Sequence, residues 1–202
     1  MVTPAVAPVA TKATASINSM LIPFDELKAE TLDAVRNACR KACLTKAVEL
    51  WGERQAVTIR DIAATDMGYT NNYFTNTSVT ANAWAAQAVG SFTVATATVI
   101  GIYGIRLLVI HDGTIDFCPI SAMRIEVGGA RIAQWALQSL TDMTSATSTG
   151  TSVAYAGITK SPIVVAEDIS VTMYEYTQTT GTVYDSTWIG MVVEKEGVTL
   201  KP

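Results

Sequence analysis

The sequence is short of charge. Only 16% of its 202 residues are charged and 49% are hydrophobic, whereas about a quarter of the residues in a typical globular protein are charged. So little charge suggests that something other than water covers part of the surface. The formal net charge of −4 and the pI near 5.0 give no electrostatic reason to expect a broad nucleic-acid surface.

Histidine is also scarce, and this limits catalysis. His111 is the only histidine, so any Ser-His or Cys-His nucleophile would depend on it. It directly precedes an expected Asp-Gly turn, and no Gly-x-Ser-x-Gly elbow accompanies it. Carboxylates occur at expected turns and on expected solvent-exposed strand faces, and they show no local signature of a catalytic pair. They are Asp112, Asp116, Glu126, Glu167 and Asp168. We therefore predict no catalytic residue and no enzyme activity.

Three cysteines are too few for a disulfide framework, and an odd number leaves at least one thiol free, which indicates a reducing compartment. Cys39, Cys43 and Cys118 do not have the spacing of paired Cys-x-x-Cys zinc ligands, even with His111 added. Cys39 and Cys43 fall on the apolar side of an expected helix, which favours buried thiols. Glycine-rich phosphate loops are absent too, so we predict neither a metal nor a cofactor.

Residues 1–22 contain mainly Pro, Ala, Thr and Val with one charge, Lys12. They lack the basic region and continuous apolar run of a secretory signal. Pro4 and Pro8 favour extended backbone. Two interpretations stay open: a disordered tail, or an arm that becomes ordered on neighbouring subunits.

Charge is concentrated in one segment: residues 25–66 hold 15 of the 32 charged residues. The region 23–54 is predicted to contain a long amphipathic helix that spans most of residues 25–51 and in which acids precede bases, an order that suits the helix dipole. The apolar positions recur every four residues and are Val35, Cys39, Cys43, Ala47 and Trp51. Gly52 is the expected terminator, and a helix of about 40 Å could break near Asn37.

The bases of this helix are Arg36, Arg40, Lys41 and Lys46. Because acids flank them, they favour a solvated helix face over a nucleic-acid site.

No charge occurs in residues 68–105. The run exceeds the roughly 20 residues that span a bilayer, but its threonines, glycines and β-branched residues favour strands over a transmembrane helix. Contact with a membrane surface stays open. We read residues 92–100 as one strand with alternating faces, and we expect residues 90–110 to be β structure at or near subunit contacts.

Other segments predict further strands and loops. Residues 56–62 are the first expected strand, and the Asn-rich residues 66–82 are read as a long exposed loop.

Two hairpins are expected. One joins residues 102–110 to residues 115–120 around Asp112-Gly113, and the other joins residues 123–127 to residues 131–137 around Gly128-Gly129. Residues 141–151 read as a polar loop, and further strands are expected at 161–165, 169–176 and 184–195, with the core face ending near Met173. Eight to ten strands without a later helix predict an antiparallel β-sandwich or barrel over residues 55–202.

A Pro/Ala-rich arm, an amphipathic helix, about eight strands and the pair SPIVVAEDISVTMYEY and STWIGMVVEKEG resemble single jelly-roll capsid proteins of tailless icosahedral viruses. The resemblance covers residues 55–200 in outline and carries over no functional residue. It implies a jelly-roll-like sandwich that is made in the host cytoplasm and assembled into the virion capsid. Its partners would be copies of itself and other capsid proteins, without a small-molecule substrate.

Two further functions are weighed. A subunit of a β-rich extracellular filament would complete a neighbour's sheet by strand addition, but no export signal supports it. A carbohydrate-binding or carbohydrate-active sandwich would use Trp84, Trp135 or Trp188 as sugar platforms. Trp135 and Trp188 fall within expected strands, where core or interface packing is the simpler use.

Overall fold

The computed structural model describes residues 21–23, 28–71, 75–77, 80–109, 120–136, 153–177 and 183–197. Most of the expected arm, the turn around His111 and the loop at 141–151 lie outside them. The elements are β1 (Leu21–Pro23), α1 (Ala29–Trp51), β2 (Val57–Asp61), η2 (Ala64–Met67), β3 (Thr75–Thr77), β4 (Ala83–Thr93), β5 (Thr98–Val109), β6 (Ile120–Val127), β7 (Ala130–Ala136), β8 (Val153–Val165), β9 (Ser170–Thr177) and β10 (Val183–Lys195).

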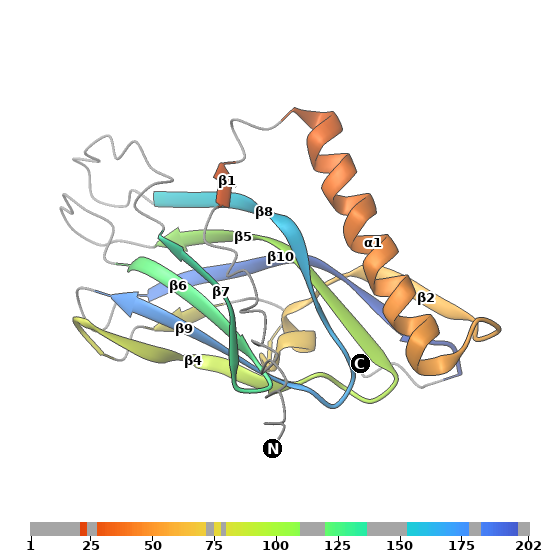
Figure 1. Ribbon diagram of the computed structural model, residues 1–202. Coiled ribbons are helices and arrows are strands. Elements are labelled where there is room, and N and C mark those ends of the chain that lie inside the picture. The colour runs from red at the N-terminus through yellow and green to blue at the C-terminus, as the bar shows by residue number, and fades with distance from the viewer. Residues whose placement is uncertain are drawn as a thin grey trace, which may run out of the picture.

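Two antiparallel sheets pack as a sandwich, and α1 lies outside one of them (Figure 1). The six-stranded sheet has the order β1-β8-β5-β10-β2, with β3 also paired to β10, and the four-stranded sheet has the order β4-β9-β6-β7. The predicted mainly-β sandwich with one long helix is confirmed. No helix in the described ranges is long and apolar enough to cross a membrane.

Eight of the strands pair as a set of nested hairpins. β2 pairs with β10, β4 with β9, β5 with β8, and β6 with β7. Successive pairs alternate between the two sheets. A chain folded double and rolled up in this way has the strand order of the double-sheet jelly roll, so the predicted jelly-roll-like architecture is confirmed at the level of topology.

The core between the sheets is built from alternate side chains of both inner faces. Trp135 on β7 and Trp188 on β10 are each 1% exposed, and their ring centroids lie 6.0 Å apart. Around them pack further fully buried residues, among them Ile100, Ile102, Ile105, Leu107, Ile120, Met123 and Ile125. The two tryptophans therefore join the sheets, as their positions in expected strands predicted.

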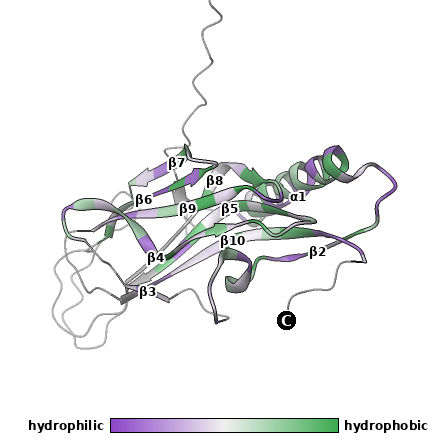
Figure 2. Ribbon diagram, turned by 90° about the horizontal axis from the view of Figure 1, so that it is seen from below, coloured by the Kyte–Doolittle hydropathy of each residue, from purple (hydrophilic) through white to green (hydrophobic). Residues whose placement is uncertain are grey.

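α1 covers the outer face of the six-stranded sheet and contacts β5, β8 and β10 of its own chain. Cys39, Cys43 and Ala47 are buried there, so the predicted apolar stripe is confirmed. Gly101 on β5 permits the close approach, because a Cβ at this position would lie 2.6 Å from Cys39 Sγ and closer still to Cys43 Sγ. In Figure 2, hydrophilic and hydrophobic bands alternate along α1.

The boundaries of α1 differ from the expectation at one end. The helix begins at Ala29, after Lys28 in extended conformation, rather than near residue 25. It ends as predicted at Gly52, whose φ is 85° and whose N–H donates to the carbonyl oxygen of Val48. No break occurs near Asn37, because the buried stripe holds the whole helix on the sheet.

From Ala83 onward the uncharged segment is mostly β structure, as predicted, but it is not one strand. β4 ends at Thr93 and β5 begins at Thr98, and the two strands belong to different sheets. The chain changes sheet through Ala97, which has a φ of 62°. Residues 92–100 were misread because alternation of β-branched and small residues persists through the turn.

One of the two expected hairpins is wrong and the other is confirmed. Both edges of β5 are occupied by β8 and β10, so residues 102–109 cannot pair with residues 115–120. β6 and β7 do form a hairpin, and Gly128 and Gly129 at its turn have φ angles of 58° and 79°. Positive φ at both central positions is what glycine supplies at low cost.

Candidate functional site

The residues that were considered as candidates and that the structure describes lie in separate parts of the fold. Cys39 and Cys43 are fully buried beneath α1, as predicted. A hydrogen bond with Cys43, together with burial, raises the pKa of the Cys39 thiol. Cys118 and His111 lie outside the described residues. Within the described ranges, no three His, Cys, Asp or Glu side chains are grouped to hold a metal ion.

The described acids stabilise separate local structures. Glu167 accepts hydrogen bonds from Trp51 Nε1, at 3.0 Å, and from the N–H of Ala97, so it ties the end of α1 to the turn between the sheets. Asp168 accepts a bond of 2.9 Å from Thr96 Oγ1. Glu126 pairs with Arg124 on β6. Asp112 and Asp116 lie outside the described residues.

Polar side chains inside the sandwich were missed by sequence reasoning. Asn76 and Tyr69 belong to the segment expected to be an exposed loop, yet they are 3% and 6% exposed. The Asn76 amide donates to Tyr69 Oη and, at 3.4 Å, to Ser186 Oγ, while its Oδ1 accepts from the N–H of Val89 at 2.9 Å. Burial raises the pKa of Tyr69.

The core face of β9 extends past Met173, where it was expected to stop. Glu175 is fully buried and accepts a hydrogen bond from Tyr184 Oη. A carboxyl can occupy this position because a buried polar group is tolerated when it has hydrogen-bond partners. These interior polar groups are closed to solvent, which suits them to holding the sheets together and not to binding a substrate.

An aromatic patch lies on the outer face of the four-stranded sheet; we define it as Trp84, Arg124, Tyr174 and Tyr176. The register places Trp84 opposite Tyr176 and Arg124 opposite Tyr174. The Arg124 guanidinium carbon is 4.8 Å from the Trp84 ring centroid and 4.2 Å from that of Tyr174. Such stacking is a cation–π interaction. Trp84 and Tyr176 meet edge to face, with centroids 5.7 Å apart.

The four side chains of the patch contact one another and are partly buried. Arg124 Nε lies 3.2 Å from Glu126 Oε1, and the two side chains are 13% and 19% exposed. Trp, Tyr and Arg are the residues most enriched at the energetic centres of protein interfaces. Of the three tryptophans considered as sugar platforms, Trp84 alone reaches an outer face, since Trp135 and Trp188 are in the core.

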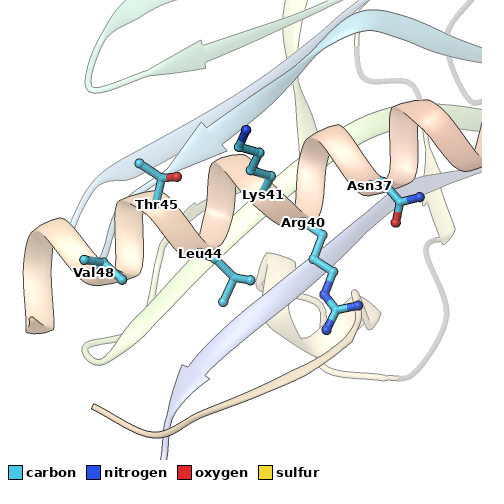
Figure 3. A pocket seen from close by; sticks show the side chains of 6 residues that line it. All are labelled: Asn37, Arg40, Lys41, Leu44, Thr45 and Val48. Carbon is cyan, nitrogen blue, oxygen red and sulfur yellow. The ribbon is translucent and has the colours of Figure 1, made fainter. Parts of the chain in front are cut away.

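A second surface feature is a shallow hollow of about 410 Å³ on the outer side of α1 (Figure 3). We call it the helix hollow; it is lined by Asn37, Arg40, Lys41, Leu44, Thr45 and Val48. Leu44 and Val48 supply apolar surface, and Arg40 and Lys41 supply positive charge. Val48 is 43% exposed, which is unusual for a large apolar side chain in the described residues.

Between α1 and β2 runs a groove of about 540 Å³ that contains three arginines. Two of them are neutralised locally. Arg36 pairs with Asp61 at 3.2 Å, and Arg60 pairs with Asp66 and Glu194, each at 2.6 Å. The hydrogen bond with Asp66 raises the pKa of Arg60. Of the helix bases, Arg36 and Lys46 pair with exposed acids, which fits the solvated helix face predicted for them.

No family model and no curated protein matches the chain. Among solved structures it is similar to the CBM36-1 domain of a multidomain xylanase from the hindgut metagenome of Trinervitermes trinervoides, at 10% identity over 70% of this chain and 100% of that one, with a TM-score of 0.29. It is also similar to a structure of infectious bursal disease virus Gx strain, at 10% identity over 71% of this chain and 34% of that one, with a TM-score of 0.30. The Agl-KA catalytic domain matches at 10% identity over 73% of this chain and 26% of that one, with a TM-score of 0.30. Likeness at this level carries no argument about function.

Proposed function

We propose that the protein is a structural subunit of a viral capsid shell, built from copies of itself. The nested strand order carries the proposal, because the double-sheet jelly roll is a recurrent building unit of viral capsids. The same fold also occurs in lectin domains. The choice between a shell subunit and a sugar-binding domain therefore depends on the surfaces of the protein.

The surfaces are consistent with assembly. Charge is scarce over most of the chain, and the aromatic patch presents Trp84, Arg124 and two tyrosines on a sheet face that no described element covers. We assign this patch to a contact with a neighbouring subunit. The proposal places the protein in the virion, after synthesis in the host cytoplasm, and gives it no catalytic activity.

Electron microscopy of the purified protein, combined with measurement of its particle mass, tests the proposal. Closed shells, rings or regular lattices are expected, and Trp84→Ala should reduce their yield because it removes the largest ring of the patch. Ile169→Ala is the matched control, since Ile169 is 38% exposed and lies outside the patch. A protein that stays monomeric over the full concentration range would contradict the proposal.

The aromatic patch also supports a second candidate, carbohydrate binding. Aromatic rings can stack on the C–H faces of sugars, and Arg124 and Glu126 can offer hydrogen bonds to hydroxyl groups. A glycan array followed by titration calorimetry distinguishes the two candidates. Saturable binding that Trp84→Ala abolishes, by a protein that forms no assemblies, would favour this candidate over the shell subunit.

A further inference from the structure

Three sulfur-containing side chains meet beneath α1, over a position of β5 that has no side chain. They are Cys39 and Cys43 of α1 and Met191 of β10, and we call them the sulfur cluster. A Cβ on Gly101 would lie 2.6 Å from Cys39 Sγ, closer still to Cys43 Sγ, and 3.8 Å from Met191 Cγ. Both cysteines are 0% exposed and Met191 is 3% exposed. The three side chains therefore converge on one enclosed point between the helix and the sheet.

The two thiols of the sulfur cluster contact each other. They share a hydrogen bond, because residues four apart in sequence lie on the same face of a helix. A thiol binds a metal ion by exchanging its proton for the ion. The space between the two hydrogen-bonded sulfur atoms is therefore a place where a cation with affinity for sulfur can replace a proton.

The surroundings of the cluster select a soft, singly charged ion. Thiolate and thioether sulfur are ligands that Cu(I) prefers, whereas Mg²⁺ and Ca²⁺ require oxygen. Zn²⁺ in a closed site takes four ligands, and within the described ranges no third His, Cys, Asp or Glu is grouped with the two cysteines. A Cu(I) ion bound to one thiolate is neutral, which favours it in an apolar interior. The other buried residues packed around the cluster are Ala47, Val99, Tyr103, Ile158 and Val193.

We propose that the sulfur cluster binds one Cu(I) ion. Cys39 Sγ and Cys43 Sγ are the principal ligands, and the thioether of Met191 is the third. The ion takes the place of a thiol proton, which leaves to solvent, and copper stays in the +1 state. This site does not depend on the proposed function of the protein.

The position of the cluster gives the ion a route that leaves the sandwich closed. Met191 also lines the groove of about 540 Å³ between α1 and β2, so the cluster lies next to a groove that opens to solvent. α1 and the residues beneath it form a core of their own outside the six-stranded sheet, separate from the core between the sheets (Figure 1). A local outward movement of the helix therefore exposes the thiols while the two sheets stay together. Bound copper would then join α1 to β10.

Anaerobic titration with tetrakis(acetonitrile)copper(I), in competition with the chelator bicinchoninate, measures the binding. The protein carries Cys118→Ser, so that Cys39 and Cys43 are its only thiols. We expect one Cu(I) per chain and only sulfur neighbours in X-ray absorption. Cys39→Ala and Cys43→Ala should each lower the affinity about a hundredfold, and Met191→Leu about tenfold. Fewer than one ion per chain, binding that both cysteine variants retain, or nitrogen or oxygen neighbours would overturn the proposal.

A packing variant separates ligation from core damage. Ile158→Val removes one methyl group from the same buried cluster and leaves the sulfur atoms in place. It should keep the affinity for Cu(I) within about threefold of that of the Cys118→Ser protein, because its effect is on packing alone. A loss as large as that of Cys43→Ala would show that the cysteine variants act through packing, and would contradict the site.

Thermal unfolding separates a folded site from the thiols of the unfolded chain. One equivalent of Cu(I) should raise the melting temperature of the Cys118→Ser protein, since a ligand that binds the folded state stabilises it. The same addition should leave the melting temperature of the Cys39→Ala variant unchanged. Zn²⁺ should have no such effect, because the cluster offers three sulfur ligands and no fourth. A melting temperature that Cu(I) lowers, or that Zn²⁺ raises equally, would contradict a Cu(I) site in the native fold.

Discussion

Single residues set how closely the layers of this protein approach one another. Gly101 lies where the two buried thiols of α1 rest on β5. Glu175 and Tyr184 join the two sheets through a hydrogen bond inside the core. Both contacts join residues from distant parts of the chain, and both are buried. A change of a few atoms at either position should therefore affect the stability of the whole molecule.

We expect Gly101→Ala to destabilise the protein by about 1–3 kcal/mol, because an added methyl group in a filled core forces its neighbours to shift. The free energy of unfolding in urea measures the effect. Cys43→Ala combined with Gly101→Ala removes the nearest sulfur and should recover part of the loss. If Cys43→Ala lowered the stability of Gly101→Ala by as much as it lowers that of the native protein, the two changes would be independent. The added methyl group would then not be in conflict with the Cys43 sulfur.

Tyr69 predicts a dependence on alkaline pH. Burial raises its pKa above the usual value of 10.0, so the folded state keeps its proton where the unfolded chain loses it. The stabilising contribution is therefore fully present below pH 10 and is lost as the pH rises through the folded-state pKa. Unfolding free energies measured between pH 8 and pH 11 should fall more steeply for the native protein than for Tyr69→Phe; equal slopes would exclude the contribution of Tyr69.

At the scale of elements, short segments are fastened to the margins of the sandwich by specific polar contacts. η2 is held by Asp66, which accepts from the N–H of Ala63 at 2.7 Å and from both terminal nitrogens of Arg60 on β2. Arg60 also reaches Glu194 on β10. The segment between β2 and β3 is therefore tied to two strands, although its composition indicated a loop.

We expect Asp66→Ala to cost about 1–2 kcal/mol of stability, since it removes a helix cap and leaves Arg60 with one partner in place of two. Thermal and chemical denaturation both measure this loss. Asp61→Ala is the matched control, because the Asp61 side chain is 74% exposed and its pair with Arg36 is open to solvent. The control should change stability by less than about 0.5 kcal/mol; equal losses would show that the cap and the partial burial of Asp66 have no special effect.

At the scale of the whole molecule, the jelly roll offers three kinds of surface to neighbours: the aromatic patch, the outer face of α1 and the margins of the sheets. β1 pairs with β8 at one margin, through Leu21 and Pro23. The residues before it are apolar and nearly uncharged. In the proposed shell these residues would contribute contacts between subunits, and the sandwich itself would fold without them.

Deleting residues 1–20 tests that division of roles. The shortened chain keeps β1, so circular dichroism and the unfolding midpoint should stay close to those of the full chain. The yield of shells or lattices in electron microscopy should fall severalfold, because subunit contacts are lost. Unchanged assembly would show that residues 1–20 do not act as an assembly arm. The control is Lys12→Ala, which removes the one charge of this segment and should leave assembly intact.

The sequence by itself determined the features whose causes are local. The apolar residues of α1 recur at helical spacing, Gly52 ends the helix, and Gly128-Gly129 supplies the positive φ angles of the β6–β7 turn. The strands β2, β9 and β10 were also indicated, since their composition favours extended backbone. The abundance of strands and the lack of a later helix predicted the sandwich.

Only the tertiary structure decided which strands pair and which polar groups lie inside. The partners of β5 are β8 and β10, which are distant in sequence, so the turn signal after β5 could not reveal them. Glu175 and Asn76 look like surface residues because their composition is polar, and they are buried because Tyr184, Tyr69 and Ser186 supply hydrogen bonds there. Local propensity acts over a few residues, whereas strand pairing and polar burial depend on contacts that exist only once the two sheets close on each other.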